Sequence, residues 1–351
     1  MDTSTKNNFE NLHKEIIFNE TLYIKIFDYI KSDNWDLVLK IIEENNIDYD
    51  IKDNMNIYIL EYIISHNKIK VLQAILNKNI RINILDENNR SILYTVIKFS
   101  YIEILKELLK KDKEIIGNTI LEITDNDKNI PLFYAIKFLN FEAVTLIMNN
   151  MNNYYIKNIN GDNALHIAIE SNNFEIFKFL LTKIKNVNIK NNIGNTPFHL
   201  IIINKCHSML EYILNLEDLE YNTTNIIFYT PLHYLCRICD YKLFQIIKNK
   251  IHLFNGNIQD KSGNIFIHYF ITYINKNFKD QHQSSSILEM YNILLKIKFN
   301  YNLFNIEGNI SCHLLFDNFI IFQKNFSIII NNFIINSNLN IQNNLGESCF
   351  F

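Results

Sequence analysis

Residues Gly194–Leu200 read Gly-Asn-Thr-Pro-Phe-His-Leu and contain a turn followed at once by the start of a helix. Gly194 is suited to the positive φ angle that a tight turn needs. Thr196 is a favourable N-cap, and Pro197 has the fixed φ and missing N–H that suit a first helical position. His199 then lies one turn into the helix, where its imidazole can bond back toward the cap.

The same junction recurs along the chain, and we take its histidine as the register position of each repeat. The register positions are Phe27, Leu60, Tyr94, Phe133, His166, His199, His233, His268, His313 and Phe351. Their intervals are 33, 34, 39, 33, 33, 34, 35, 45 and 38 residues by subtraction. All three prolines (Pro131, Pro197 and Pro231) stand two places before a register position. Five of the seven glycines stand five places before one: Gly161, Gly194, Gly263, Gly308 and Gly346.

The Thr-Pro-x-His junction and the period of about 33 residues resemble the ankyrin repeat. The resemblance is closest at Asn160–Ala168, which reads Asn-Gly-Asp-Asn-Ala-Leu-His-Ile-Ala. It implies an all-α solenoid of about ten helix-turn-helix units, joined by loops that resemble β-hairpins. The structural signature is then carried by Gly161, His166, Gly194, Thr196, Pro197, His199, Pro231, His233, Gly263, His268, Gly308 and His313.

The repeats divide the chain into a polar lead-in, residues 1–20, and an ankyrin repeat domain over residues 21–351. Residues 275–286 are polar and interrupt the period, so we expect a solvent-exposed loop there, with Ser286 capping the next helix. The chain ends at Phe351, inside the first helix of a tenth unit, so we expect the last repeat to be cut short. In the seventh unit Phe228 and Tyr229 replace the turn Gly-x, which predicts a distorted hairpin.

Composition limits the classes of partner and the compartment. A net charge of −3 among 71 charged residues gives no reason to expect that the chain binds nucleic acid. The apolar stretch Leu314–Ile335 is interrupted by Asp317, Gln323, Lys324 and Asn325, so it predicts buried helices and no membrane span. The first fifteen residues lack the apolar core of a signal peptide, and we expect a cytoplasmic or nuclear monomer with five reduced cysteines.

The heavy use of Asn and Ile indicates an AT-rich genome, and on that ground we interpret the Asn-rich stretches as coding bias. The bias and the divergent repeats resemble the stand-alone ankyrin proteins of large DNA viruses. Intracellular bacteria and AT-rich protists are alternative sources. For a viral protein the compartment would be the host cytoplasm.

The sequence predicts no catalysis and no cofactor. It contains no glycine-rich phosphate loop after a strand and no nucleophile–base pair, and the histidines recur because the junction recurs. His233, Cys236 and Cys239 have a spacing that could hold a metal, with Cys206 or His207 as a fourth ligand. The alternative, which we favour, is that the two cysteines fill the core and that no metal binds.

The resemblance implies binding of a protein partner through the hairpin tips and the concave face of the first helices. It nominates Arg90, Lys98, Phe99, Lys137, Phe138, Ile226, Ile227, Phe228, Tyr229, Arg237 and Tyr273. We expect Tyr229 and Arg237, at an exposed apolar hairpin, to lie at the centre of this surface. Two alternatives stay open. Ile and Phe can occur at these positions through coding bias alone, or the chain can recruit substrates for a ubiquitin ligase, with an F-box-like region beyond Phe351.

Overall fold

The computed structural model describes residues 20–45, 48–78, 80–114, 120–277, 284–316 and 327–349. The ordered elements of these residues are helices, accompanied by isolated β-bridges at the stems of four hairpins, such as Lys52–Tyr58. The predicted all-α fold of helix pairs joined by hairpin-like loops is therefore confirmed.

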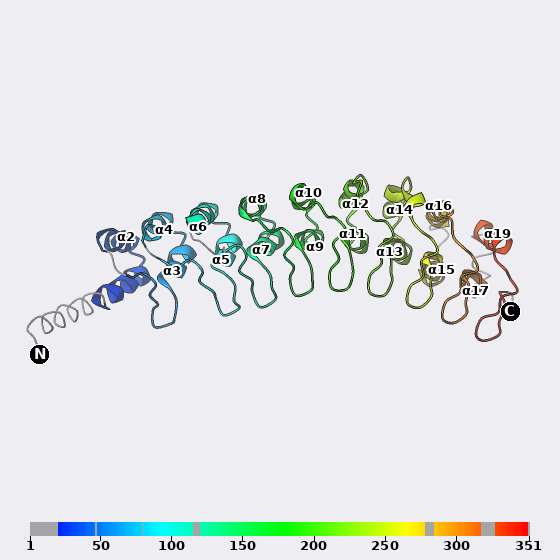
Figure 1. Cartoon of the computed structure of the whole chain (residues 1–351), viewed down its shortest axis with the longest axis horizontal. Coiled ribbons are helices and arrows are strands. Elements are labelled where there is room, and N and C mark those ends of the chain that lie inside the picture. Colours follow the sequence, from blue (N-terminus) through cyan, green and yellow to red (C-terminus); the bar gives the residue numbers. More distant parts are fainter. Residues whose placement is uncertain are drawn as a thin grey trace, which may run out of the picture. The chain divides into compact units, whose positions relative to one another are not determined.

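The chain forms two compact units, Met1–Asn158 and Ile159–Phe351. In the first unit α3 packs on α5 and α5 on α7, while α2, α4, α6 and α8 form a second layer in the same way (Figure 1). The hairpin loops extend from the layer that contains α3, α5 and α7. The helices are α2 (Trp35–Glu44), α3 (Ile59–Ser65), α4 (Ile69–Leu76), α5 (Leu93–Lys98), α6 (Ile102–Glu114), α7 (Pro131–Lys137) and α8 (Phe141–Asn150).

The second unit repeats this arrangement. Its first helices are α9 (Ala164–Glu170), α11 (Pro197–Ile203), α13 (Pro231–Ile238), α15 (Phe266–Asn277) and α17 (Ser311–Phe316), each packed on the next. Its second helices are α10 (Phe174–Lys183), α12 (His207–Ile213), α14 (Tyr241–Ile247), α16 (Ser284–Leu294) and α19 (Ser327–Asn336), with a 3₁₀ turn η1 (Ile251–Leu253) after α14. The prediction of one repeat domain over residues 21–351 stays a prediction.

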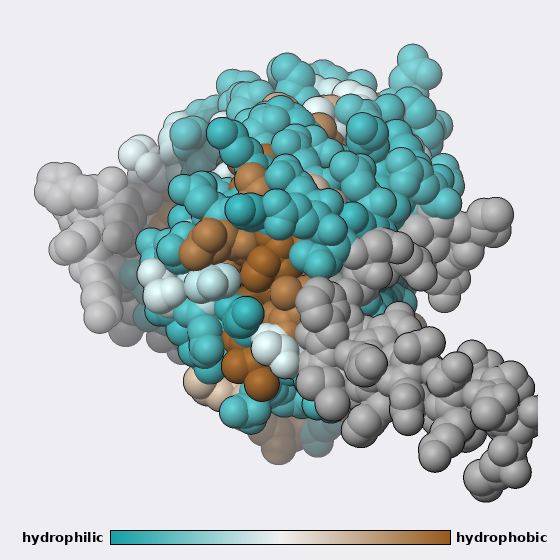
Figure 2. Space-filling view, turned by 90° about the vertical axis from the view of Figure 1, so that its left-hand side faces the viewer, coloured by the Kyte–Doolittle hydropathy of each residue, from teal (hydrophilic) through white to brown (hydrophobic). Residues whose placement is uncertain are grey.

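Between the two layers of each unit lies a core of aliphatic and aromatic side chains. Phe133 in the first unit and Phe198, Phe244 and Phe270 in the second are fully buried. Figure 2 shows the N-terminal face, where hydrophobic residues form a band bordered by hydrophilic ones. Within the described part of the chain, no helix combines the length and the apolar composition needed to cross a bilayer.

An Asp or Asn side chain closes most hairpins, eight places before the register position. Oδ1 of Asn225, for example, accepts the N–H groups of Ile227 and Tyr229 at 3.1 and 2.9 Å. Such a turn is typical of Asx residues, whose short side chain mimics the backbone. The same position is taken by Asp53, Asp86, Asp125, Asn191, Asp260, Asn305 and Asn343.

The five glycines that stand five places before a register position have the positive φ angles that the sequence predicted, such as 78° at Gly194. Gly194 also lies against the next hairpin. A Cβ atom there would come within 2.8 Å of Cα of Asn225 and 2.9 Å of the Ile226 nitrogen. The absence of a side chain is therefore required twice, by the backbone angle and by the neighbouring repeat.

The histidines at the register position join each repeat to the next. Nδ1 of His199 accepts the N–H of Thr196 at 3.1 Å, which completes a capping box. Its Nε2 donates to the carbonyl oxygen of Tyr229, in the following hairpin, at 3.0 Å. His166, His233, His268 and His313 make the equivalent bond to the next hairpin. These bonds support the predicted structural role of the histidines.

The register position of the second repeat was wrong by one residue. The positive φ angle lies at Asn56 and the N-cap of α3 at Tyr58, so the register residue is Glu61 and not Leu60. Glu61 accepts the N–H of Tyr58 at 2.8 Å, the bond that histidine makes elsewhere. Leu60 was assigned because it is apolar, like Phe27 and Phe133 at the register positions of other repeats.

Asparagines also link neighbouring repeats, which the interpretation as coding bias did not predict. Nδ2 of Asn225 donates to Oδ1 of Asn195 in the preceding repeat at 2.9 Å, and Asn343 does the same to Asn309 at 3.0 Å. This bond needs a side chain that donates, which aspartate cannot do. Eleven places before the register position, Asn222 accepts the N–H of Asn255 at 2.7 Å, and Asp50 accepts that of Arg81 in the same way.

The predicted insertion is shorter than residues 275–286. Helix α15 extends to Asn277 and α16 begins at Ser284, so residues 275–277 and 284–286 are helical. Asn275 donates from Nδ2 to the carbonyl oxygen of Leu314 at 2.9 Å, and this bond to the next repeat holds the end of α15 in place. Residues 278–283, most of the lead-in at 1–20, and the terminal Phe351 lie outside the described residues.

Candidate partner-binding surface

The hairpin at Ile226, Ile227 and Phe228, here called the Phe228 tip, is exposed as predicted. The three residues are 53%, 38% and 50% exposed. The predicted distortion of the hairpin is absent, since its Asn225–Tyr229 hydrogen bond of 3.0 Å matches the 3.0 Å bond between Asn191 and Asn195. Phe228 instead adopts a φ angle of 61°, in the place where the other hairpins of the second unit have glycine and those of the first unit have Asn56, Asn89 and Lys128, also with positive φ angles.

Tyr229 is buried, so the expectation that its side chain is exposed at the hairpin was wrong. The side chain is 9% exposed and its hydroxyl lies 2.6 Å from that of Tyr269. Its ring also stacks on His233, with centroids 5.6 Å apart. Tyr229 directly precedes the N-cap Thr230, where the chain turns inward, so its ring packs between two repeats.

Arg237 and Tyr273 lie close to this hairpin on the first helices. Arg237 is exposed, and its Cζ lies 6.0 Å from the centre of the Tyr229 ring. Tyr273 is half-buried, and burial raises the pKa of its hydroxyl. Arg237 is therefore available to a partner, whereas Tyr273 offers only part of its side chain.

The remaining nominated residues belong to the first unit. Lys98, Phe99, Lys137 and Phe138 are exposed on α5, α7 and the turns that follow. The ring of Phe138 lies 5.9 Å from that of Tyr94.

Arg90 is half-buried in this cluster. Its Nε donates to Oδ2 of Asp86 at 2.6 Å, and its guanidinium lies 3.8 Å from the Tyr94 ring centre. The guanidinium is thus already paired within the chain, and Arg90 has less freedom to bind a partner than its nomination assumed.

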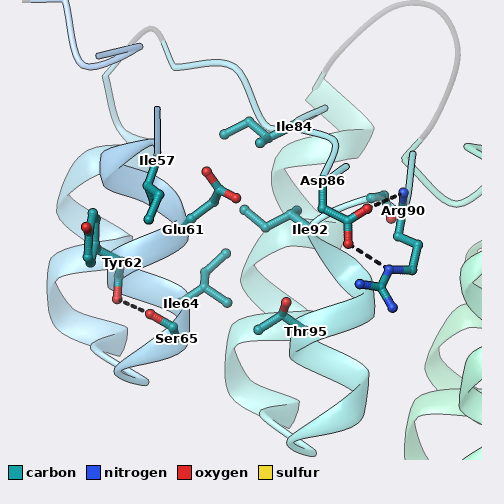
Figure 3. A pocket seen from close by; sticks show the side chains of 11 residues that line it. Ile57, Glu61, Tyr62, Ile64, Ser65, Ile84, Asp86, Arg90, Ile92 and Thr95 are labelled. Carbon is teal, nitrogen blue, oxygen red and sulfur yellow. Dashed lines mark hydrogen bonds and ion pairs between the residues drawn. The ribbon is translucent and has the colours of Figure 1, made fainter. Parts of the chain in front are cut away.

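A cavity of about 260 Å³ lies between α3 and α5 (Figure 3). Glu61 points into the space between the two helices, while the guanidinium of Arg90 lies beyond Asp86 on the far side. Isoleucine side chains from both repeats, among them Ile64 and Ile92, form the rest of the wall. Arg90 is the one nominated residue that lines the cavity. The cavity therefore does not lie at the centre of the predicted partner-binding residues.

The arrangement of His233, Cys236 and Cys239 fits the packing interpretation. Both nitrogens of His233 are used, by Thr230 and by the carbonyl oxygen of Asn264. The Cys239 thiol donates to the Cys236 carbonyl oxygen at 2.7 Å, and burial raises the pKa of both thiols well above the usual range. Within the described ranges, no group of three or more His, Cys, Asp or Glu could hold a metal ion.

Sequence reasoning missed that the Phe228 tip has exposed apolar neighbours. Ile193 in the preceding hairpin is exposed, and its carbonyl oxygen accepts the N–H of Ile226 at 3.1 Å. Lys261 in the following hairpin lies with its Nζ 5.9 Å from the Phe228 ring centre. The signal is present in the sequence, since these residues recur six or seven places before the register position.

Comparison with known proteins agrees with this geometry. A family model for ankyrin repeats (three copies) matches residues 113–191 and 132–225. An ankyrin repeat protein of Acanthamoeba polyphaga mimivirus is 27% identical over 283 residues, which are 68% of this chain but 32% of the relative. The chain thus matches about a third of the length of that relative.

Among solved structures, the chain is similar to the ankyrin repeat domain of Bcl-3, a member of the IkappaB protein family. The TM-score is 0.53 at 12% identity, over 62% of this chain and 94% of that chain. With the repeated hairpin, the capping histidine and the two helical layers of each unit, these matches show ankyrin repeats within residues 113–225 and, for the described part of the chain, the fold of an ankyrin repeat domain.

Proposed function

We propose that this chain is a non-catalytic protein-binding module, and that its second unit contacts a protein partner through the Phe228 tip, with Arg237 at the margin. Ankyrin repeats are protein–protein interaction modules, which supports the general class. Exposed apolar side chains and arginine are the groups that contribute most at protein interfaces.

The observation that carries the proposal is the backbone of Phe228. A residue with a Cβ atom in the left-handed region costs about 1–2 kcal/mol, which glycine avoids. The half-exposed ring contacts Lys261, whose Nζ lies 5.9 Å from its centre, a contact worth about 0.5–1 kcal/mol at an exposed site. Strained positions with little internal compensation are typical of functional sites.

Phe228→Gly should therefore have a free energy of unfolding about 0.5–1 kcal/mol above that of Phe228→Ala, because relief of strain exceeds the added entropy of the unfolded chain. Phe228→Ala is the matched control, since both variants remove the ring and only the alanine variant keeps the strain. Urea unfolding measures both variants. Equal midpoints for the two variants would mean that the backbone at Phe228 is not strained, and the argument from strain would fail.

Binding can be tested by placing a photo-crosslinking phenylalanine analogue at Ile227. The matched control carries it at Lys178, an exposed position on α10 away from the hairpins. An amoebal lysate is the first choice, because the relative is encoded by a virus named for Acanthamoeba. We expect crosslinked proteins at Ile227 that unlabelled wild-type chain competes away and Phe228→Gly chain does not. Equal competition by both chains, or the same products from Lys178, would place binding elsewhere.

A further inference from the structure

The cavity between α3 and α5 lies at a junction with an unusual register residue. Nine of the ten register positions carry a ring, from histidine, phenylalanine or tyrosine, and Glu61 is the exception. Its carboxylate points into the space between the two helices (Figure 3). A carboxylate group is smaller than a ring, and it contains no N–H donor. The sequence therefore explains why a cavity of about 260 Å³ lies at this junction.

The lining residues place the cavity where the second unit holds an imidazole. His199 donates from Nε2 to the carbonyl oxygen of Tyr229, and the backbone carbonyl of Thr223 also faces that ring. Tyr229 and Thr223 stand four and ten places before the next register position. The residues at the same two places in the third repeat are Arg90 and Ile84, and both line the cavity. The cavity thus takes the place of the imidazole, between equivalent backbone carbonyl groups.

The charge of this cavity is negative. Oε2 of Glu61 accepts the N–H of Tyr58 at 2.8 Å, and the carboxylate makes no ion pair with the described part of the chain. The second carboxylate of the lining, that of Asp86, is already used, because it accepts the Nε–H of Arg90 at 2.6 Å and the N–H of Asn88 at 2.9 Å. The Arg90 guanidinium lies beyond Asp86, away from Glu61 (Figure 3). The cavity therefore offers acceptors to a cation that donates hydrogen bonds.

The walls of the cavity select an organic cation. Ile57, Ile64 and Ile92 line it, and its volume is that of about eight or nine waters of about 30 Å³ each. A calcium ion takes about six to eight oxygen ligands, more than one carboxylate and two carbonyl groups supply. An alkylammonium group has three N–H donors for these three acceptors, and its carbon chain can pack on isoleucine.

We propose that the cavity binds a primary alkylammonium group, with its nitrogen between the Glu61 carboxylate and the carbonyl groups of Ile84 and Arg90. A lysine side chain of a partner protein and a free amine share this chemistry. The site belongs to the first unit and does not depend on the Phe228 tip. The failure of either proposal therefore leaves the other in place.

The test uses n-butylammonium chloride as the probe and the full chain labelled with ¹³C at the isoleucine δ1 methyl groups. The methyl signals of Ile57, Ile64 and Ile92 are assigned through single Ile→Val variants. We expect saturable shifts of these signals at constant ionic strength. n-Butyltrimethylammonium, which has the same charge and chain but no N–H, and calcium chloride should not produce them. Equal shifts with either control, or no saturable shift with n-butylammonium, would overturn the proposal.

Variants of the chain test the role of Glu61. Glu61→Gln keeps an acceptor for Tyr58 but loses the charge, so it should weaken binding about tenfold or more. Glu87→Gln is the matched control, because it removes the same charge from an exposed residue of the next hairpin that does not line the cavity. Glu61→His should abolish binding, since an imidazole would fill the site as His199 does in its own repeat. Circular dichroism checks that each variant is folded.

Equal weakening by the two glutamine variants, or wild-type binding by Glu61→His, would show that the probe binds elsewhere. A blocked lysine, Nα-acetyl-lysine methylamide, then distinguishes the two sources of the ammonium group. Binding as tight as that of n-butylammonium would assign the site to a lysine side chain, whereas binding about tenfold weaker would assign it to free amines. Tighter binding of the blocked arginine would overturn the choice of an ammonium group.

Discussion

Gly194→Val should lower the free energy of unfolding by about 2–5 kcal/mol. The positive φ angle of 78° costs about 1–2 kcal/mol for a residue with a side chain. The new Cβ would also meet the backbone of Asn225 and Ile226 within 3 Å, and such overpacking adds about 1–3 kcal/mol. Urea unfolding followed by circular dichroism measures the loss.

Gly346→Val is the matched control for this prediction. Gly346 has nearly the same φ angle, 80°, but no heavy atom lies within 4 Å of the Cβ position. Gly346→Val should therefore lower the free energy of unfolding only by the backbone strain, about 1–2 kcal/mol. Equal losses at the two glycines would mean that the hairpin at Asn225 moves aside without cost, and that contact between the tips contributes nothing to stability.

Acidification should destabilise the second unit between about pH 6.5 and pH 4. Burial lowers the pKa of His199 and of His268 to about 4, and lowers that of His233 as well. In the unfolded chain the pKa of histidine is about 6.5, so the unfolded state binds more protons in this window and stability falls as the pH falls. The largest loss is about 3 kcal/mol for each of His199 and His268.

His199→Gln tests this origin, because glutamine can accept and donate hydrogen bonds but does not titrate. The variant should lose less stability than the wild type between about pH 6.5 and pH 4. Carboxylates act in a separate window. Although burial of Asp125 favours the protonated form, hydrogen bonds from Tyr134 and Asn129 hold its pKa below the usual value, so its contribution is lost below about pH 4. An unchanged pH dependence in His199→Gln would assign the loss to other groups.

The period and the turn chemistry could be predicted from sequence because they depend on residue types with few alternatives. A positive φ angle selects glycine and a first helical turn accepts proline, so their spacing alone located most hairpins. Asparagine was misread because composition says nothing about partners. The bond between Asn225 and Asn195 becomes visible only when two repeats are placed side by side.

The candidate surface was harder to predict because exposure can change sharply between two adjacent residues. Phe228 and Tyr229 are both large aromatics in a turn, yet Phe228 points to solvent and Tyr229 packs against Tyr269. The orientation follows from the turn geometry and from the neighbouring repeat. A pattern that treats the hairpin as a block of exposed residues cannot separate the two.

The hydrogen bonds that the register histidines donate to the next hairpin affect the order in which the hairpins open locally. The five histidines that make this bond all belong to the second unit, whereas the register positions of the first unit are Phe27, Glu61, Tyr94 and Phe133. Glu61 and Phe133 have no side-chain N–H to donate, so their junctions lack a bond worth about 1 kcal/mol. The hairpins of the first unit should therefore exchange their amide hydrogens with solvent sooner, through local openings that leave the second unit closed.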